Sequence, residues 1–337
     1  MKTVLITGSA GFIGYHCAER WLEAGWRVVG IDSFSDYYDP KLKRDRVARL
    51  AGNDAFTQIE EKIETPGALI ALFAEHKPDV VLHLAAQAGV RFSIEAPRTY
   101  VEANLQGTFE LLEAARAHPG AHLLMASTSS VYGANTVMPY VETAKADTQM
   151  SFYAATKKAT EAMAHSYAHL YEMPVTMFRF FTVYGPWGRP DMALFKFVRA
   201  MLSAEPIDVY NHGRMKRDFT YIDDLVTAIL RLADAPPSRP VSPGDIPDHD
   251  SLSPVAPFRI VNIGKAKPDA LGDFIDEIEQ SLGIEAKRNL MDMQPGDVPA
   301  TWSDTKLLEA ITGYAPSTPL SVGIPAFVKW YREYYGV

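Results

Sequence analysis

Short apolar runs alternate with longer amphipathic segments over the first half of the chain. Apolar runs bounded by turn residues predict buried strands at residues 4–7, 27–31, 79–84, 121–126 and 175–181. Between them, helical spacing predicts helices at residues 15–24, 97–116 and 152–171. Buried strands that alternate with helices are typical of a parallel sheet with helices on both faces. We therefore predict an α/β fold with a doubly wound sheet.

The pattern is less regular after about residue 185. A helix is predicted at 221–234 and a strand at 258–263. Between them, residues 236–257 contain seven prolines in 22 positions, which excludes a helix and predicts a long surface loop or mobile flap. The remainder is rich in Pro, Trp and Tyr and predicts a smaller, mixed domain.

Composition narrows the class of protein. The 337 residues carry 33 basic and 41 acidic side chains, a net charge of −8, which disfavours a nucleic-acid partner. The single cysteine, Cys17, cannot form an internal disulfide, and the sequence shows no metal-ligand spacing. No apolar run is long enough for a membrane span, and the first residues lack a signal-peptide pattern. We expect a cytoplasmic protein without a membrane partner or a metal.

A glycine-rich turn follows the first predicted strand. Residues 7–14 read TGSAGFIG, so that Gly8, Gly11 and Gly14 open the first helix together with Phe12 and Ile13. Glycines here permit a tight turn and let the backbone approach a pyrophosphate, which the helix amides then face. The spacing predicts a dinucleotide site; the alternative is a purely structural turn.

Two further features support this site. Asp32 ends the second strand, 18 residues after Gly14, where a carboxylate accepts hydrogen bonds from both ribose hydroxyls and repels a 2′-phosphate. This favours NAD over NADP, although Asp32 would also suit a turn or cap. After the strand at 79–84, small residues suit a cofactor that crosses the strand ends, or plain strand–turn packing. The residues expected near the cofactor are Leu84, Ala85, Ala86 and Gln87.

These features define a Rossmann-type sheet with a smaller, mixed C-terminal substrate domain. We assign residues 1–180 to the NAD-binding domain, to which 219–234 and 258–264 return. Residues 181–218 and 265–337 are then the substrate domain.

Tyr153 and Lys157 are the main candidates for catalysis. Four residues apart on a predicted helix, they share one face. A tyrosine with its ordinary pKa of about 10 is a poor base at neutral pH, and a nearby ammonium favours the phenolate. Residues 126–133 read ASTSSVYG and place four hydroxyls at the carboxyl end of a strand, where doubly wound sheets bind ligands. The alternatives are a surface Tyr–Lys pair and a simple Ser/Thr turn.

Together these motifs resemble the UDP-glucuronate 4-epimerase branch of the extended short-chain dehydrogenase/reductase family of nucleotide-sugar enzymes. The resemblance extends over essentially the whole chain. It includes the segments at 32–40, 88–93, 179–193, 294–298 and 327–335, of which YYDP and TVYGPWGRPDM are specific to this branch.

The resemblance implies a reaction and roles for three residues. Tyr153 removes the O4 proton of the sugar while the C4 hydride passes to NAD, Lys157 binds the nicotinamide ribose and lowers the tyrosine pKa, and Thr128 holds the sugar hydroxyl. The 4-keto sugar then turns over and takes the hydride back on its other face, so that UDP-glucuronate becomes UDP-galacturonate. NAD stays tightly bound and is regenerated in each turnover.

A uronate oxidised at C4 is a β-keto acid, which loses CO2 when its carboxylate aligns with the ketone. We expect Ser129, Ser130 and Thr182 to hold the carboxylate out of that alignment. Related dehydratases carry Asp-Glu after the threonine and decarboxylases carry a Glu. The two serines of this chain cannot act as such an acid, which disfavours both reactions.

The rest of the substrate site is also implied by the resemblance. Arg189 and Arg217 are candidates for the diphosphate, since a guanidinium suits phosphate oxygens. Gly89, Val90 and Arg91 are expected beside the substrate, although Arg91 would equally suit a loop cap. Asp297 is expected at the uridine ribose, with main-chain contacts near 196–197 and 209–210. Gln294 departs from the Arg of many relatives, so we expect no phosphate contact there.

Three other functions remain open at this stage. They are a UDP-glucuronate decarboxylase, a 4-epimerase of neutral UDP-hexoses, and a NAD-sensing binding protein. The family also implies a homodimer through helices near 98–116 and 153–170.

Overall fold

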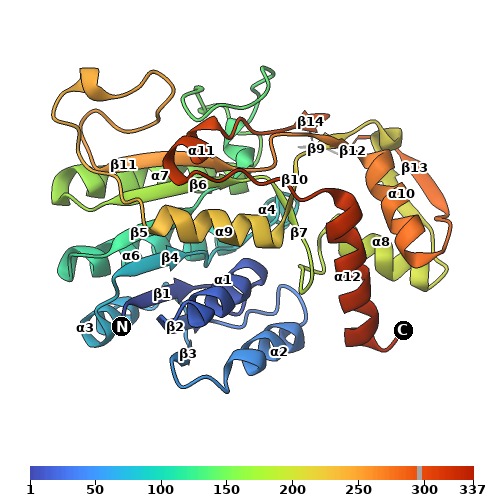
Figure 1. The fold of residues 1–337 in the computed structure, drawn as a ribbon, viewed down its shortest axis with the longest axis horizontal. Coiled ribbons are helices and arrows are strands. Elements are labelled where there is room, and N and C mark those ends of the chain that lie inside the picture. Colours follow the sequence, from blue (N-terminus) through green and yellow to red (C-terminus); the bar gives the residue numbers. More distant parts are fainter. Residues whose placement is uncertain (294–297) are drawn as a thin grey trace.

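The computed structural model describes residues 1–293 and 298–337. Its centre is a sheet of seven parallel strands in the order β11-β6-β5-β4-β1-β2-β3 (Figure 1). This order, which reverses beside β1, is that of a doubly wound nucleotide-binding sheet and confirms the predicted fold class. The strands are β1 (Thr3–Thr7), β2 (Arg27–Asp32), β3 (Phe56–Glu60), β4 (Val80–His83), β5 (His122–Ala126), β6 (Val175–Phe180) and β11 (Phe258–Ile263).

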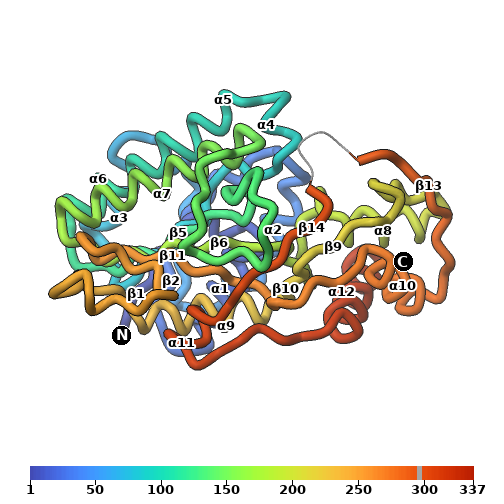
Figure 2. Tube along the Cα trace, turned by 90° about the horizontal axis from the view of Figure 1, so that it is seen from above, coloured from blue at the N-terminus to red at the C-terminus, as the bar shows by residue number. Residues whose placement is uncertain are grey.

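Helices cover both faces of the sheet (Figure 2). Along β1, Val4 and Ile6 pack into the core beside α1 and α9, while Leu5 between them packs into the core beside α3, α6 and α7. Alternate side chains of a strand point to opposite faces, so an unbroken apolar run serves both cores. The helices of the first face are α1 (Phe12–Glu23), α9 (Ile222–Ala233) and α11 (Lys306–Thr312). Those of the second are α3 (Ala68–His76), α6 (Gly107–Ala117) and α7 (Phe152–Tyr171).

The prediction of one continuous helix at 97–116 is wrong in the middle of that range. The structure has α5 (Pro97–Tyr100), a π-helical turn η1 (Val101–Gln106) and then α6. Within this turn Asn104 is buried; its Oδ1 accepts from the Gln87 amide at 2.7 Å, and its Nδ2 donates to Thr156 Oγ1 at 3.0 Å. Insertions of this kind are frequent at functional sites, and here the turn ties the loop after β4 to α7.

A third apolar cluster lies at the other end of the molecule. Three helices build it, α8 (Ala193–Leu202), α10 (Leu271–Leu282) and α12 (Leu320–Tyr335), and the rings of Phe219 and Phe274 stack at 4.2 Å within it. Small sheets connect it to the main sheet. They pair β7 (Thr182–Tyr184) with β10 (Phe219–Tyr221), β8 (Ile207–Tyr210) with β13 (Arg288–Met291), and β9 (Lys216–Arg217) with β12 (Asp269–Ala270) and β14 (Ala300–Thr301).

Short elements complete the chain. They are α2 (Pro40–Leu50), α4 (Phe92–Glu95), η2 (Ser129–Tyr132), η3 (Asn211–Gly213) and η4 (Pro243–Asp245).

The proline-rich segment 236–257 packs along the outer edge of the sheet. Ser251 Oγ accepts from the Ile260 amide at 3.0 Å, Asp250 forms an ion pair with Arg259 of β11, and Ser253 Oγ lies 2.8 Å from His165 Nε2 of α7. Such a cover protects the exposed edge of β11 from pairing with another strand. Over the described residues, no helix is both long and apolar enough to cross a membrane.

Candidate active site

The turn between β1 and α1 is built of closely packed backbone. Gly8 has a positive φ of 74°, and its amide donates to the Ile31 carbonyl at 2.8 Å. A Cβ on Gly14 would lie 2.2 Å from the Gly8 carbonyl oxygen, and one on Gly11 would lie 2.9 Å from the same atom. Phe12 and Ile13 start α1 directly after this turn. Residues larger than glycine therefore do not fit at positions 11 and 14, and the turn leads directly into the first amides of α1.

Asp32 lies beside this turn and is buried. Its Oδ2 accepts from the Ala10 amide at 3.1 Å and its Oδ1 from the Phe34 amide at 2.8 Å. Burial raises the pKa of Asp32, while the charges of Lys43 and Arg46 and the two amide hydrogen bonds oppose that rise. The carboxylate thus holds the ends of β1 and β2 together at the predicted ribose position.

The loop after β4 approaches the same turn. Thr7 Oγ1 accepts from the amides of Leu84 and Ala85 at 3.2 and 3.1 Å, and it lies 2.8 Å from His83 Nδ1. Burial lowers the pKa of His83 to about 3, so its ring is neutral at pH 7. Ala86 and Gln87 continue this loop, and the Gln87 amide is held by Asn104. These hydrogen bonds hold the loop after β4 against the end of β1 and against η1.

Tyr153 and Thr128 meet at the entrance to α7. The α7 N-cap is Ser151, whose hydroxyl accepts from the Ala154 amide at 3.1 Å, and Tyr153 follows in the first turn. Burial raises the pKa of Tyr153, and its hydrogen bond with Thr128 and the charge of Arg189 oppose that rise. Ser130 donates its amide to Thr128 Oγ1 at 3.2 Å, which fixes the hydroxyl cluster.

Lys157 lies on the same face of α7 as Tyr153 and is buried. Burial lowers its pKa to about 8, and the negative charge of Glu161 opposes this. Glu161 is itself buried, with the Nε and Nη2 of Arg179 each 2.9 Å from one of its oxygens and Ser127 Oγ donating at 2.7 Å. The ion pair lowers the pKa of Glu161 to about 2 despite its burial.

A pocket of about 740 Å³ opens from Tyr153 toward the third apolar cluster. The structure brings together in its wall ten of the residues predicted from the sequence: Gly89, Val90, Arg91, Thr128, Ser129, Ser130, Tyr153, Thr182, Arg189 and Arg217. The residues predicted at the cofactor, with the exception of Tyr153, lie outside this wall: at the β1–α1 turn, at the end of β2 for Asp32, in the loop after β4, and on α7 for Lys157. The predicted positions Gln294 and Asp297 lie outside the described residues.

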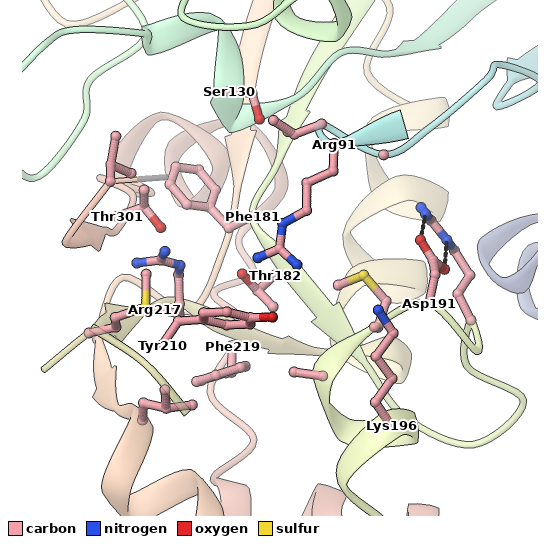
Figure 3. A pocket seen from close by; sticks show the side chains of 18 of the residues that line it. Arg91, Ser130, Phe181, Thr182, Asp191, Lys196, Tyr210, Arg217, Phe219 and Thr301 are labelled. Atoms are coloured by element: carbon pink, nitrogen blue, oxygen red, sulfur yellow. Dashed lines mark hydrogen bonds and ion pairs between the residues drawn. The ribbon is translucent and has the colours of Figure 1, made fainter. Parts of the chain in front are cut away.

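Three basic side chains surround the substrate end of the pocket. In Figure 3, Arg91 extends from one wall toward Thr182 and Tyr210, with Arg217 and Lys196 on either side. The Arg91 guanidinium lies 4.8 Å from the centre of the Tyr210 ring. Arg189 forms an ion pair with Asp191, its Nε 3.0 Å from Asp191 Oδ1, and Tyr37 donates to the same carboxylate at 3.2 Å.

Comparison with known proteins decides the family. Residues 4–244 match the model of the NAD-dependent epimerase/dehydratase family. The chain belongs to this family. A probable UDP-glucuronate 4-epimerase of Rhizobium meliloti is 51% identical over 98% of this chain and 97% of its own length. UDP-glucuronate 4-epimerase 4 of Arabidopsis thaliana is 44% identical over 99% of this chain and 76% of its own.

Solved structures of the family agree. UDP-glucuronic acid 4-epimerase of Bacillus cereus, in complex with UDP-glucuronic acid and NAD, superimposes with a TM-score of 0.88 at 32% identity. The match covers 99% of this chain and all of the other. The family predicted from the sequence motifs is therefore confirmed.

Several pocket residues of this family member were not predicted. Tyr37 and Asp191 lie in the two segments that carry the resemblance, yet only their pairing across the pocket shows a role for them. Phe181, Phe219, Tyr140 and Thr301 reach the pocket from separate elements. Phe181 directly precedes the predicted Thr182, whereas Phe219 and Thr301 are brought to the pocket by small sheets whose strands lie far apart in the sequence. In the described part of the chain, no cluster of three or more His, Cys, Asp or Glu residues could hold a metal.

Proposed function

We propose that this protein is a NAD-dependent UDP-glucuronate 4-epimerase that interconverts UDP-glucuronate and UDP-galacturonate. The observation that carries the proposal is the hydroxyl cluster of Thr128, Ser129 and Ser130 beside Tyr153 in one pocket wall. It combines a proton acceptor with neutral hydrogen-bonding groups and places no carboxylic acid after Thr128. The relatives named UDP-glucuronate 4-epimerase, and the complex of one with UDP-glucuronic acid and NAD, support the same reaction.

The residues present fit NAD. The glycine turn has no room for a Cβ at Gly14, which keeps the start of α1 close to the end of β1 and leaves its amides for a pyrophosphate. Asp32 offers a carboxylate at the end of β2, and Lys157 offers a buried ammonium on the same face of α7 as Tyr153. When bound there, NAD would supply the hydride acceptor and donor for sugar C4.

Tyr153 moves the proton of the sugar O4. Its phenol is hydrogen-bonded to Thr128, which we propose also holds the O4 hydroxyl in line with it. Because burial raises the pKa of Tyr153, positive charge must be near for the phenolate to form at neutral pH. Arg189 already lowers the Tyr153 pKa; we propose that Lys157 adds further positive charge from the same face of α7, and Glu161 favours the protonated lysine.

The substrate side of the pocket holds the remaining groups of UDP-glucuronate. We propose that Ser129, Ser130 and Thr182 bind the uronate carboxylate and that Arg189 and Arg217 bind the diphosphate. All five line the pocket. Arg189 is paired with Asp191 through its Nε and Nη2, which fixes the direction of its guanidinium.

The test uses purified protein with UDP-glucuronate and no added NAD, followed by NMR of the sugar protons. We expect UDP-galacturonate to rise to a steady ratio without CO2 release. A UDP-pentose or a 4-keto-pentose with CO2 would instead identify a decarboxylase. Absence of turnover with UDP-glucuronate, but turnover with UDP-glucose, would identify an epimerase of neutral sugars.

We also propose a homodimer formed through α6 and α7. Apolar side chains on and beside these helices are exposed in the single chain, among them Phe109, Phe152 and Tyr171 at 45%, 40% and 43%. Burying large apolar side chains in a four-helix contact is favourable. Light scattering after gel filtration should give about twice the chain mass, and Phe109→Glu should give the monomer.

Two sequence predictions are carried forward with this proposal. The division into a NAD-binding domain and a substrate domain is supported by the third apolar cluster, which is distinct from the two clusters at the sheet. Limited proteolysis with and without NAD tests it. A cytoplasmic location remains a prediction that cell fractionation tests.

A further inference from the structure

Arg46, on α2, is the most completely buried arginine of the cofactor side, with none of its surface exposed. Its guanidinium lies behind the glycine turn, away from the pocket wall. Burying a cation is costly unless all its donors are satisfied. All of its donors are satisfied here, and by acceptors from three separate segments.

The hydrogen bonds of Arg46 use every N–H of the guanidinium. Nη1 donates to the Ala10 carbonyl at 3.0 Å and to the Tyr38 hydroxyl at 2.9 Å. Nε and Nη2 donate to the Trp187 carbonyl at 3.2 and 2.6 Å, and Nη2 also donates to the Gly188 carbonyl at 3.2 Å. These are five bonds for five donors.

The segments that share these bonds belong to opposite sides of the site. Ala10 lies in the glycine turn, between Gly8 and Gly11, and its amide binds Asp32. Trp187 and Gly188 directly precede Arg189, which lines the substrate pocket. His16, on the first helix, adds a contact of 2.9 Å from its Nε2 to the Pro186 carbonyl. One buried guanidinium therefore connects the cofactor turn to the loop that carries a predicted diphosphate ligand.

We propose that Arg46 is a positioning residue that couples cofactor binding to nucleoside-diphosphate binding. If either segment moves, the guanidinium loses acceptors inside a buried site, so the two segments are stable together in one arrangement. A ligand that orders one segment then favours the ligand of the other. The inference rests on the proposed function only for the identity of the two ligands, NAD and a UDP-sugar.

The test is a pair of binding constants for NAD, measured by calorimetry with and without saturating UDP on protein from which the bound NAD has been removed. For the wild type we expect UDP to tighten NAD binding by about fivefold or more, within the usual range of coupling between sites. In Arg46→Lys the charge stays, but a single ammonium cannot bridge the glycine turn and the 187–188 carbonyls. We expect the UDP effect on the NAD constant to fall to less than about twofold, with both ligands still bound.

A matched control comes from the next turn of the same helix. Arg49 is exposed, donates to Tyr15 and lies 5.3 Å from the Trp187 ring, so Arg49→Lys perturbs the same loop through its side chain alone. It should keep the wild-type coupling. Tyr38→Phe removes one acceptor and provides a milder variant if Arg46→Lys does not fold; coupling should fall at least twofold.

The outcomes separate the two proposals. If the wild-type protein epimerises UDP-glucuronate but its NAD binding constant is the same with and without UDP, the coupling is overturned and the proposed function stands. Unchanged coupling in both Arg46→Lys and Tyr38→Phe would overturn the role of Arg46 and also leave the proposed function intact. Protein that binds neither NAD nor UDP would overturn the proposed function and, with it, this inference.

Discussion

The cofactor turn and the substrate pocket lie at the same end of the sheet, yet they are built in different ways. The turn is a single stretch of eight residues, and its shape depends on backbone and on the missing Cβ atoms of Gly8, Gly11 and Gly14. The pocket wall draws on side chains from Tyr37 to Thr301. The three glycines of the turn thus tolerate almost no substitution, whereas single substitutions in the pocket wall can change its chemistry.

This difference agrees with how folds acquire function. A fixed turn can serve many reactions of a NAD-dependent family, and the choice among them lies in the variable wall. In this chain the wall carries Ser129 and Ser130 after Thr128, where we expect a decarboxylase or dehydratase to carry an acid. Changes to the wall should therefore alter the reaction, and changes to the turn should abolish cofactor binding altogether.

The largest effect is expected for Tyr153→Phe, at the junction of the two regions. It removes the only group we assign to the O4 proton, and general acid–base catalysis contributes about 10²–10⁴-fold. We expect kcat to fall by about a thousandfold while NAD stays bound. Tyr335→Phe, at the exposed end of α12 and away from the proposed dimer contact, is the control and should leave kcat unchanged. More than a tenth of wild-type kcat in Tyr153→Phe would require another base.

The next effect tests the turn. In Gly14→Ala the new Cβ would lie 2.2 Å from the Gly8 carbonyl oxygen, so the start of α1 must shift. Overpacking of this kind costs about 1–3 kcal/mol, and the shift removes the amides from the phosphate position. Purified protein should therefore lose its NAD, detected by absorbance after denaturation. Gly272→Ala, on α10 with open space around it, should keep both NAD and stability. Retained NAD in Gly14→Ala would show that the turn is not the cofactor site.

Local features of these regions can be predicted from the sequence, whereas contacts between distant segments cannot. The glycine turn, Asp32 and the Tyr153–Lys157 pair could be predicted, because each is local and has a fixed spacing. Six of the seven strands of the main sheet could be predicted from their apolar runs, but the edge strand β3 could not, because its sequence FTQIE is half-polar and only partly buried. The π-turn at 101–106 could not, because it depends on Asn104 reaching Gln87 and Thr156, contacts that no helical pattern records. The Arg46 bonds to residues 187–188 and the Asp191–Tyr37 contact were missed for the same reason: each joins segments more than 100 residues apart.

A smaller effect concerns how the free energy of unfolding depends on pH, through the buried ion pair of Glu161 and Arg179. Glu161 is held by Arg179 and Ser127, and its pKa falls from 4.5 to about 2 on folding. A depressed carboxyl pKa stabilises the fold above pH 4.5, and this contribution is lost as the pH falls toward 2. Urea unfolding from pH 5 to pH 3 should show this loss in the wild type and a weaker pH slope in Glu161→Gln.

Glu161→Gln should be less stable at every pH, because Arg179 stays buried without its carboxylate. The ionisation of Glu161 is therefore measured only by how steeply the free energy of unfolding changes with pH, not by its absolute value. Asp147→Asn breaks an exposed pair with Lys145 and serves as the control; exposed pairs contribute little, so its slope should match the wild type. Equal slopes in Glu161→Gln and the wild type would place the acid-sensitive group elsewhere.

The smallest expected effect tests the chemistry of the wall most directly. Thr182→Val keeps the shape of the side chain and removes the hydroxyl that we propose binds the uronate carboxylate. A freer carboxylate reaches alignment with the C4 ketone more often, so decarboxylated product should rise several-fold relative to UDP-galacturonate while kcat changes by less than about fivefold. Thr301→Val, in the same wall on β14, should leave the ratio unchanged. NMR of the sugar products measures the ratio. Because the two products branch from one 4-keto sugar, their ratio is independent of how much active enzyme each preparation contains, and an unchanged ratio in Thr182→Val would leave the carboxylate to Ser129 and Ser130.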